Sequence, residues 1–308
     1  MRLLQFKEKM DLAGYALLTI EHYSIAVQIF FRYIQDEEGL ASPDEICKQH
    51  ITSYHATMRY IPYDQEKQKF LSTSSIRRRL KALKAYFKLL AKGDLIEKDL
   101  SKEIDLPPQR DALPKRVPSE KDMVILLTSI IPTRPVQTRD RALLELMYAS
   151  GLRSSEVRSI TVDALSLQEK TIFVTGKGSK DRIIPVGSWV IPYLKEYLNC
   201  RQEFSTEPSN LFFLSKGGKK ITEGNLCDLL RKYTKKAGLD CHITPHSFRH
   251  ACATHVLKGG ADIRYVQELL GHSKLSSTQI YTKVDISFLK EAHAKFHPGG
   301  KDRDELPD

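Results

Sequence analysis

The hydrophobic pattern of the first hundred residues is typical of amphipathic helices. Between residues 18 and 39, apolar side chains recur at helical spacing and the stripe ends near a glycine, Gly39. The stripe consists of Tyr23, Val27, Phe30, Phe31 and Ile34. A Ser-Pro-Asp-Glu sequence at residues 42–45 is a helix start, because proline suits the first helical position. We therefore predict a helical N-terminal region.

A second feature of this region is a helix with one strongly basic side. Residues 72–94 begin with the cap Ser72 and place Ile76, Leu80, Leu83, Phe87 and Leu90 on one apolar face. The other face carries Arg77, Arg78, Lys81, Lys84, Lys88 and Lys92, without acidic partners at helical spacing. Such a face is either a solvated helix surface or a phosphate-binding surface, and the missing acidic partners favour DNA contact. We predict DNA contacts from Arg77, Arg78, Lys81, Lys84 and Lys88.

A proline-rich segment interrupts the pattern after residue 104. It contains four prolines and interleaved charges up to Asp122. Proline restricts its own φ and disfavours helix in the residue before it, which predicts an extended linker. We predict an N-terminal helical domain at 1–105, a linker at 106–118, a second domain at 119–298 and a flexible tail at 299–308.

The second domain mixes helical and strand patterns. Ser119 caps a helix start, and another helix ends at Gly151. Residues 170–186 form two β-rich runs around a Gly-Lys-Gly-Ser-Lys-Asp turn, which predicts a hairpin, and residues 210–215 predict a short strand. Most of the chain from 222 to about 296 has helical periodicity. The fold class is therefore mainly α with a small β-sheet.

Charge and composition narrow the partners. The formal net charge is +10, which favours a polyanion such as nucleic acid. No stretch approaches the roughly 20 apolar residues of a membrane-spanning helix, and the N-terminus lacks an apolar signal core. Five cysteines without a CxxC pair suit a reducing compartment. We therefore expect a cytoplasmic protein without a membrane partner. The adjacent residues Cys241 and His242 could resemble a metal-binding pair, but we interpret them as a loop or core position.

Five polar residues stand at the edges of strongly apolar segments: Arg153, His246, Arg249, His272 and Tyr281. His246 and Arg249 are three residues apart at a helix start, so their side chains share a face. Arg153 follows a helix-ending glycine, and His272 follows another glycine at the end of an amphipathic segment. Each residue alone has an ordinary structural explanation, but together they predict one site.

Five ordered motifs carry a resemblance to a known family: GLRSSEV at 151–157, GKGSKDR at 176–182, HSFRHACATH at 246–255, LLGHSKLSSTQIYTKV at 269–284 and LKEAHAKFHPGG at 289–300. They resemble the catalytic domain of tyrosine recombinases, closest to the Xer and phage-integrase group. The N-terminal helices and the proline linker resemble that family's core-binding, SAM-like domain. The resemblance implies two domains that close as a C-shaped clamp on DNA.

The resemblance also implies roles for the site residues. Arg153 and Arg249 match the two arginines that bind the scissile phosphate, a task for which a guanidinium fork is suited. Tyr281 matches the nucleophile that forms a covalent 3′-phosphotyrosine, which preserves the bond energy without ATP. Lys177 matches the general acid for the leaving 5′ oxygen, with Lys180 and Arg182 as rivals that we expect to contact DNA instead.

The remaining motif residues have supporting roles. His246 and His272 match positions that bind the phosphate or manage the tyrosine proton, and the sequence leaves open which is the base. Glu156 resembles the acidic partner that holds Arg153, with a simple surface ion pair as the alternative. No paired-carboxylate cluster accompanies these residues, so we expect neither a metal nor another cofactor.

The implied partner is double-stranded DNA with inverted-repeat half-sites. We predict a C-terminal helix whose apolar face consists of Phe288, Leu289, Ala292 and Phe296. This helix either docks on its own domain or links neighbouring subunits of a homo- or hetero-tetramer. We favour the link between subunits. A Xer-type recombinase, acting in dimer resolution or in mobile-element integration and excision, is the leading hypothesis; the sequence does not decide whether an accessory protein activates it. A type IB topoisomerase and a non-enzymatic DNA-binding protein are the alternatives.

Overall fold

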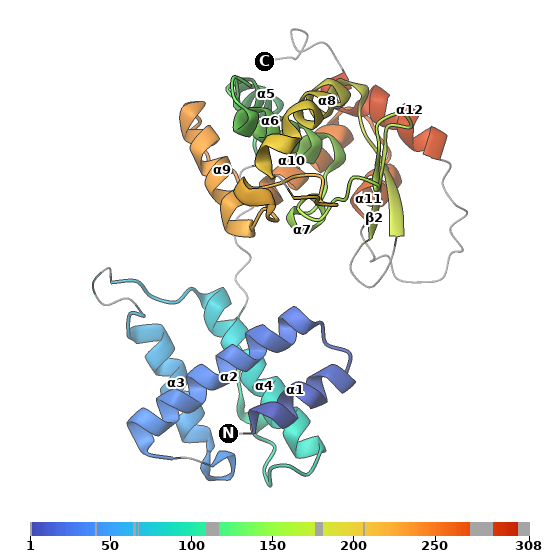
Figure 1. Cartoon of the computed structure of the whole chain (residues 1–308). Coiled ribbons are helices and arrows are strands. Elements are labelled where there is room, and N and C mark those ends of the chain that lie inside the picture. The colour runs from blue at the N-terminus through green and yellow to red at the C-terminus, as the bar shows by residue number, and fades with distance from the viewer. Residues whose placement is uncertain are drawn as a thin grey trace. The chain divides into compact units, whose positions relative to one another are not determined.

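The computed structural model of the chain describes residues 2–40, 42–63, 66, 68–108, 117–175, 181–205, 207–271 and 286–300. The chain divides into two compact units, Met1–Leu113 and Pro114–Asp308 (Figure 1). Each unit has its own cluster of buried apolar side chains.

The first unit is built from the helices α1 (Leu3–Leu12), α2 (Leu17–Glu38), α3 (Lys48–Tyr60) and α4 (Thr73–Lys92). Helices α2 and α4 pack against each other, and α3 packs on both, as does α1 (Figure 1). The centre of the core is Phe30, which is fully buried and meets the rings of Phe31, Tyr54 and Phe87 edge to face. The apolar stripes predicted for residues 18–39 and 72–94 supply nearly half of the buried side chains described for this core.

The second unit contains α5 (Glu120–Thr128), α6 (Pro135–Ser150), α7 (Ser154–Val157), α8 (Ile191–Cys200), α9 (Glu223–Lys236), α10 (Pro245–Lys258), α11 (Ile263–Leu270) and α12 (Ile286–Phe296). Both units also contain short 3₁₀ turns, at Pro43–Glu45, Leu100–Glu103, Ser188–Val190, Arg201–Phe204, Lys216–Gly218 and Pro298–Gly300. Helix α6 is the central element, because α5, α8 and α10 all pack against it. Every side chain of α6 from Arg141 to its end is buried.

A small antiparallel sheet lies beside these helices. Its strands are β1 (Leu165–Ser166), β2 (Thr171–Thr175) and β3 (Asp181–Pro185), in that order across the sheet. Ile172 pairs with Ile184 on the buried face, whereas Phe173 pairs with Ile183 on the exposed face. The predicted hairpin is therefore present, and its tip at 176–180 lies outside the described residues. Helix α12, red in Figure 1, contacts β3.

The strand predicted for residues 210–215 is wrong. Leu211 and Leu214 form only isolated bridges, to Thr161 and Lys220. Phe212 and Phe213 are both about 1% exposed, so consecutive side chains are buried rather than alternate ones. Successive side chains of a strand point to opposite faces, and this segment instead packs both rings into the core.

Two further features concern the whole described part of the chain. No helix within it is long and apolar enough to cross a membrane. The five cysteines are all free thiols, and among the described residues no three His, Cys, Asp or Glu side chains gather as metal ligands would.

Candidate active site

The candidate site is assembled at the ends of three helices of the second unit. Of the predicted catalytic residues, Arg153, His246 and Arg249 are described, as are Glu156 and Arg182. The structure brings four of these five side chains together at the ends of α6 and α11, and His246 stands one turn before Arg249 on α10. The predicted site residues outside the described part are Lys177, Lys180, His272 and Tyr281.

Arg153 is held by the short helix that it precedes. Helix α6 ends at Gly151, whose left-handed φ of 58° turns the chain, and Arg153 is the N-cap of α7. The backbone N–H of Arg153 donates to Glu156 Oε2 and its Nη1 donates to Oε1, both at 2.8 Å. The expected i, i+3 pairing of these two residues is thus seen in the structure, with the glutamate side chain only 6% exposed.

Arg249 joins the ends of two helices from a buried position on α10. Its Nη1 donates to the carbonyl of Gly151 at 2.7 Å, and its Nη2 donates to the carbonyl of Leu270 at 2.5 Å. The next carbonyl, that of Gly271, accepts from Arg153 Nη2 at 3.2 Å. The last carbonyls of a helix have no partner within the helix, so these guanidinium groups cap α6 and α11. The two arginines therefore bind consecutive carbonyls, those of Leu270 and Gly271, immediately before His272.

The electrostatics of the group favour an anion. Burial, and then the charge of Arg153, lower the pKa of Arg249 to about 10, which leaves the guanidinium protonated at neutral pH. Burial would raise the pKa of Glu156, but hydrogen bonds from Arg182 and the Arg153 backbone outweigh it and hold the pKa below its usual value. The site thus contains three guanidinium groups, two of which bind the carboxylate of Glu156, and the excess positive charge suits a phosphate.

His246 lies at the start of α10 on an exposed surface. Thr244 caps this helix, because its hydroxyl accepts the backbone N–H of Ser247 at 3.1 Å, and Pro245 occupies the first turn. The ring of His246 lies 5.5 Å from that of His250. A side chain at the start of a 14-residue helix stands at the positive end of the helix dipole, which favours an anion.

Arg182 has partners within the protein that sequence reasoning missed. Its two terminal nitrogens donate to the two oxygens of Glu156, each at 3.0 Å. The residues are 26 positions apart, so no local spacing signals the pair. The GKGSKDR motif marks Arg182 as basic and places it on the hairpin, but the fold determines which group it meets.

The basic face of α4, in the first unit, is also partly occupied. Arg77 donates to the carbonyl of Pro107, and Lys84 donates to that of Ile104 at 3.3 Å. Arg78, Lys81 and Lys88 are exposed. Two of the five cations predicted to contact DNA therefore hold the segment that leaves this unit.

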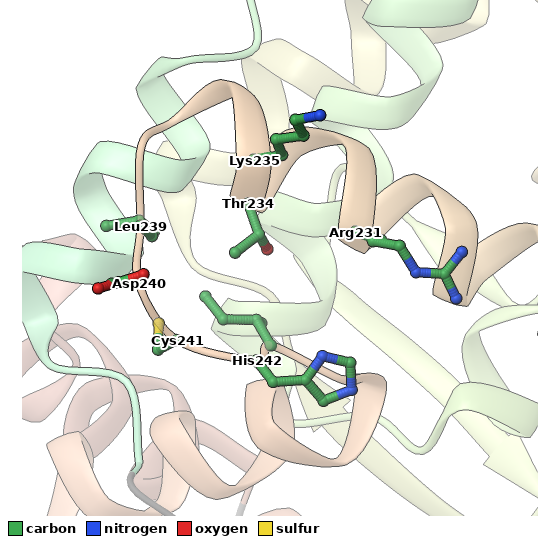
Figure 2. A pocket seen from close by; sticks show the side chains of 8 residues that line it. Arg231, Thr234, Lys235, Leu239, Asp240, Cys241 and His242 are labelled. Carbon is green, nitrogen blue, oxygen red and sulfur yellow. The ribbon is translucent and has the colours of Figure 1, made fainter. Parts of the chain in front are cut away.

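A hollow of about 340 Å³ lies between α9 and the loop before α10 (Figure 2). Arg231, Thr234 and Lys235 line it from α9, and Leu239, Asp240, Cys241, His242 and Ile243 line it from the loop. Figure 2 shows the side chains of Cys241 and His242 diverging, so they do not face a common ligand. None of Arg153, Arg182 and Arg249 lines this hollow.

Helix α12 docks on its own domain in this single chain. His293 Nε2 lies 2.7 Å from the carbonyl of Ala149, and His297 Nε2 lies 3.1 Å from that of Tyr148. Ala292, His293 and His297 are buried. This is the docking mode that the sequence left as the alternative to a contact with a neighbouring subunit.

Comparison with known proteins identifies the family. Residues 119–287 match the phage integrase family, and residues 3–97 match the phage integrase N-terminal SAM-like domain. The chain is 37% identical over 289 residues to the tyrosine recombinase XerC of Bacillus subtilis strain 168, with 92% of each chain covered. It is 35% identical over 288 residues to the tyrosine recombinase XerD of Listeria monocytogenes serotype 4b, covering 92% of this chain and 94% of the relative.

Solved structures show the same fold. The XerH site-specific recombinase in a pre-cleavage complex with difH matches with a TM-score of 0.65 at 23% identity, covering 84% of this chain and 75% of that one. The Tn1549 transposon integrase with circular intermediate DNA matches with a TM-score of 0.66 at 20% identity, covering 89% of this chain and 92% of that one. The predicted fold class, a helical SAM-like domain followed by a mainly helical catalytic domain with a small sheet, is confirmed. The chain belongs to the phage integrase family and is a Xer-type site-specific tyrosine recombinase, an enzyme that breaks and rejoins DNA.

Proposed function

We propose that this enzyme cuts and rejoins double-stranded DNA through a covalent 3′-phosphotyrosine on Tyr281 and exchanges strands through a Holliday junction. The observation that carries the proposal is the convergence of Arg153 and Arg249 on the carbonyls of Gly271 and Leu270. These carbonyls immediately precede the segment that contains His272 and Tyr281. Two charged forks at the base of that segment can stabilise the charge that develops on a phosphate when it is attacked.

The arginines supply charge stabilisation. Each guanidinium has five N–H donors, and the backbone carbonyls use only some of them, so both groups retain donors for the non-bridging oxygens of a phosphate. Glu156 keeps the Arg153 fork in one orientation, which lowers the entropy lost when the phosphate binds. The buried Arg249 acts where water does not screen its charge.

Proton transfer is assigned to the remaining motif residues. We assign Lys177 as the acid that protonates the leaving 5′ oxygen, and His246 and His272 as the residues that bind the phosphate and manage the Tyr281 proton. A phenol has an ordinary pKa near 10, so attack at neutral pH needs a partner that accepts or orients its proton. The exposed position of His246 at the start of α10 supports a contact with incoming DNA.

The substrate is proposed to be a duplex with inverted-repeat half-sites, as XerH is bound to a palindromic difH substrate in its post-cleavage complex. Arg78, Lys81 and Lys88 on α4 would contact its backbone, with Lys180 as a further contact from the hairpin. A clamp of both domains around DNA and assembly into a tetramer through the C-terminal helix belong to the same proposal. The similarity to XerC and XerD over 92% of the chain favours dimer resolution in the cytoplasm over mobile-element integration and excision.

Covalent capture tests the chemistry. Wild-type protein and the variants Tyr281→Phe and Tyr60→Phe would be mixed with nicked host genomic fragments and denatured, and the protein-linked DNA would be sequenced. Tyr60 is exposed on the first unit, so its variant is the matched control and should behave as wild type. We expect linkage at one or a few loci that Tyr281→Phe abolishes.

Other outcomes have defined meanings. Linkage spread over all sequences would favour a type IB topoisomerase. Tight binding without linkage by the wild type would contradict the proposed chemistry. Linkage that survives in Tyr281→Phe would assign the nucleophile to another residue.

A further inference from the structure

The guanidinium of Arg182 connects three parts of the catalytic unit. It is carried by β3, immediately after the hairpin tip that contains Lys177. It binds Glu156 of α7, and it lies against Gly271 at the end of α11. Its side chain is only 15% exposed. A cation that binds a DNA backbone would be expected at the surface.

The contacts of Glu156 are complete. Oε1 accepts from Arg153 Nη1 at 2.8 Å and from Arg182 Nη1 at 3.0 Å. Oε2 accepts from the Arg153 backbone N–H at 2.8 Å and from Arg182 Nη2 at 3.0 Å. A carboxylate has about four acceptor sites, so the orientation of each guanidinium depends on the other. Removing Arg182 leaves Glu156 held by Arg153 alone, so the orientation of this pair is less fixed.

The guanidinium of Arg182 also lies against Gly271, at the end of α11. A Cβ at this position would lie 2.9 Å from Arg182 Nε and 3.0 Å from its Cζ. Gly271 has a left-handed φ of 62°, and its carbonyl accepts from Arg153 Nη2 at 3.2 Å. Only glycine combines this backbone conformation with such close approach. Arg182 and Arg153 thus hold the residue that precedes His272.

We propose that Arg182 is a positioning residue for strand cleavage rather than a DNA contact. Through Glu156 it orients Arg153, and against Gly271 it fixes the end of α11. The inference rests on the proposed function, because it concerns the rate at which Tyr281 attacks. The inference predicts an effect on the cleavage rate but not on DNA binding. Loss of Arg182 lowers the cleavage rate at saturating DNA and leaves DNA affinity almost unchanged.

The test uses the full-length protein and a nicked duplex that wild-type protein has captured. Single-turnover formation of the covalent complex and the salt dependence of binding would be measured for Arg182→Gln, Arg182→Lys, Glu156→Gln and the double variant Arg182→Gln/Glu156→Gln. We expect Arg182→Gln to slow cleavage by about 10- to 100-fold, because small displacements of aligned groups cost about that much. Arg182→Lys should not restore the rate, since an ammonium cannot bind both oxygens of Glu156.

The double variant tests whether Arg182 acts through Glu156. We expect its rate to be close to that of the slower single variant, because residues in one network have non-additive effects. Gly271→Ala should slow cleavage similarly, since it displaces the same guanidinium. If the fold-reductions in cleavage rate of the two single variants multiply in the double variant, Arg182 does not act through Glu156.

Two controls separate the other roles. Lys81→Ala marks a DNA contact, for which the slope of log affinity against log salt falls by about one. Arg141→Gln removes a guanidinium that is more buried than that of Arg182, 7% against 15% exposed, and that pairs with Glu145 at 2.6 Å on α6. This variant reports the loss of thermal stability alone. We expect the affinity of Arg182→Gln for DNA to have the same salt dependence as that of the wild type. We also expect Arg182→Gln to cleave far more slowly than Arg141→Gln when the two variants have lost the same amount of thermal stability.

The results that would contradict the inference differ from those that would contradict the proposed function. A salt slope lowered as in Lys81→Ala, or a cleavage rate no slower than that of Arg141→Gln, would overturn the inference while the proposed chemistry stands. Absence of linkage by wild-type protein in the same assay would overturn the proposed chemistry, and the inference with it.

Discussion

At the scale of single residues, the end of α6 shows how closely the site is packed. Gly151 is buried with a left-handed φ of 58°, and its carbonyl accepts from Arg249. A Cβ there would lie 2.8 Å from Leu270 Cδ2 and 3.2 Å from Cys252 Sγ. Both the backbone conformation and the approach of α11 and α10 therefore require glycine.

Gly151→Ala should lower the free energy of unfolding more than Gly238→Ala, because both glycines have a left-handed φ but only Gly151 is closely surrounded. Gly238 has a φ of 65°, and a Cβ there would meet no atom within 4 Å, so Gly238→Ala carries only the backbone strain, about 1 kcal/mol. Gly151→Ala adds overpacking of about 1–3 kcal/mol. Denaturant unfolding of the catalytic unit measures both, and equal losses would contradict the packing argument.

At the scale of elements, α12 is held by aromatic and histidine rings. Trp189 stacks on His293 and His297, with ring centroids 5.2 and 5.0 Å apart. Both imidazoles contact the last turn of α6, and Tyr148 of that helix binds His255 Nδ1 at 2.8 Å. Burial lowers the pKa of His293 and of His255 to about 4, and the pKa of His297 well below its usual value. Docking of α12 thus requires neutral histidines.

The stability of the catalytic unit should fall as the pH drops from about 6.5 to about 4. In this window the unfolded chain binds protons that the folded histidines exclude, so stability rises with pH. For the fully buried His293 the effect is about 3 kcal/mol over the whole window. His293→Gln should weaken this dependence, and unfolding midpoints at pH 7, 5.5 and 4.5 measure it; parallel curves for the two proteins would contradict the assignment.

At the scale of the whole molecule, function is divided between two units with separate cores. The core of the first unit centres on Phe30, and that of the second includes the fully buried Leu143 of α6. The proposed DNA-binding cations of α4 belong to the first unit, and the arginine group belongs to the second. A domain with its own hydrophobic core can fold alone, so the two are expected to unfold as separate cooperative units.

Calorimetry should resolve two unfolding transitions. Phe30→Leu should lower the midpoint of one and leave the other in place, because its packing partners Tyr54 and Phe87 both belong to the first unit. Leu143→Ala, which leaves a cavity costing about 2–5 kcal/mol, should lower only the other midpoint. A single transition that both variants shift would show that the units unfold together.

Short-range patterns in the amino-acid sequence were enough to predict the features that depend on one element alone. Apolar spacing predicted α2 and α4 because a helix repeats every 3.6 residues, whatever it packs against. Spacing of three residues placed Glu156 beside Arg153, and the ordered motifs indicated the family that the comparisons confirm. The predicted roles of Lys177, His272 and Tyr281 stay predictions, since these residues lie outside the described ones.

The meeting of distant groups, in contrast, followed from packing in three dimensions. The strand predicted at 210–215 has the right composition, but the core takes up both Phe212 and Phe213 and no ladder forms. Arg77 and Lys84 were predicted to contact DNA, and the structure adds a donation from each to a carbonyl of the outgoing chain, which the sequence did not indicate. Arg182 reaches Glu156 because the register of β2 and β3 and the end of α6 bring them together. Such contacts depend on how separate elements pack, and periodicity along one element carries no information about its neighbours.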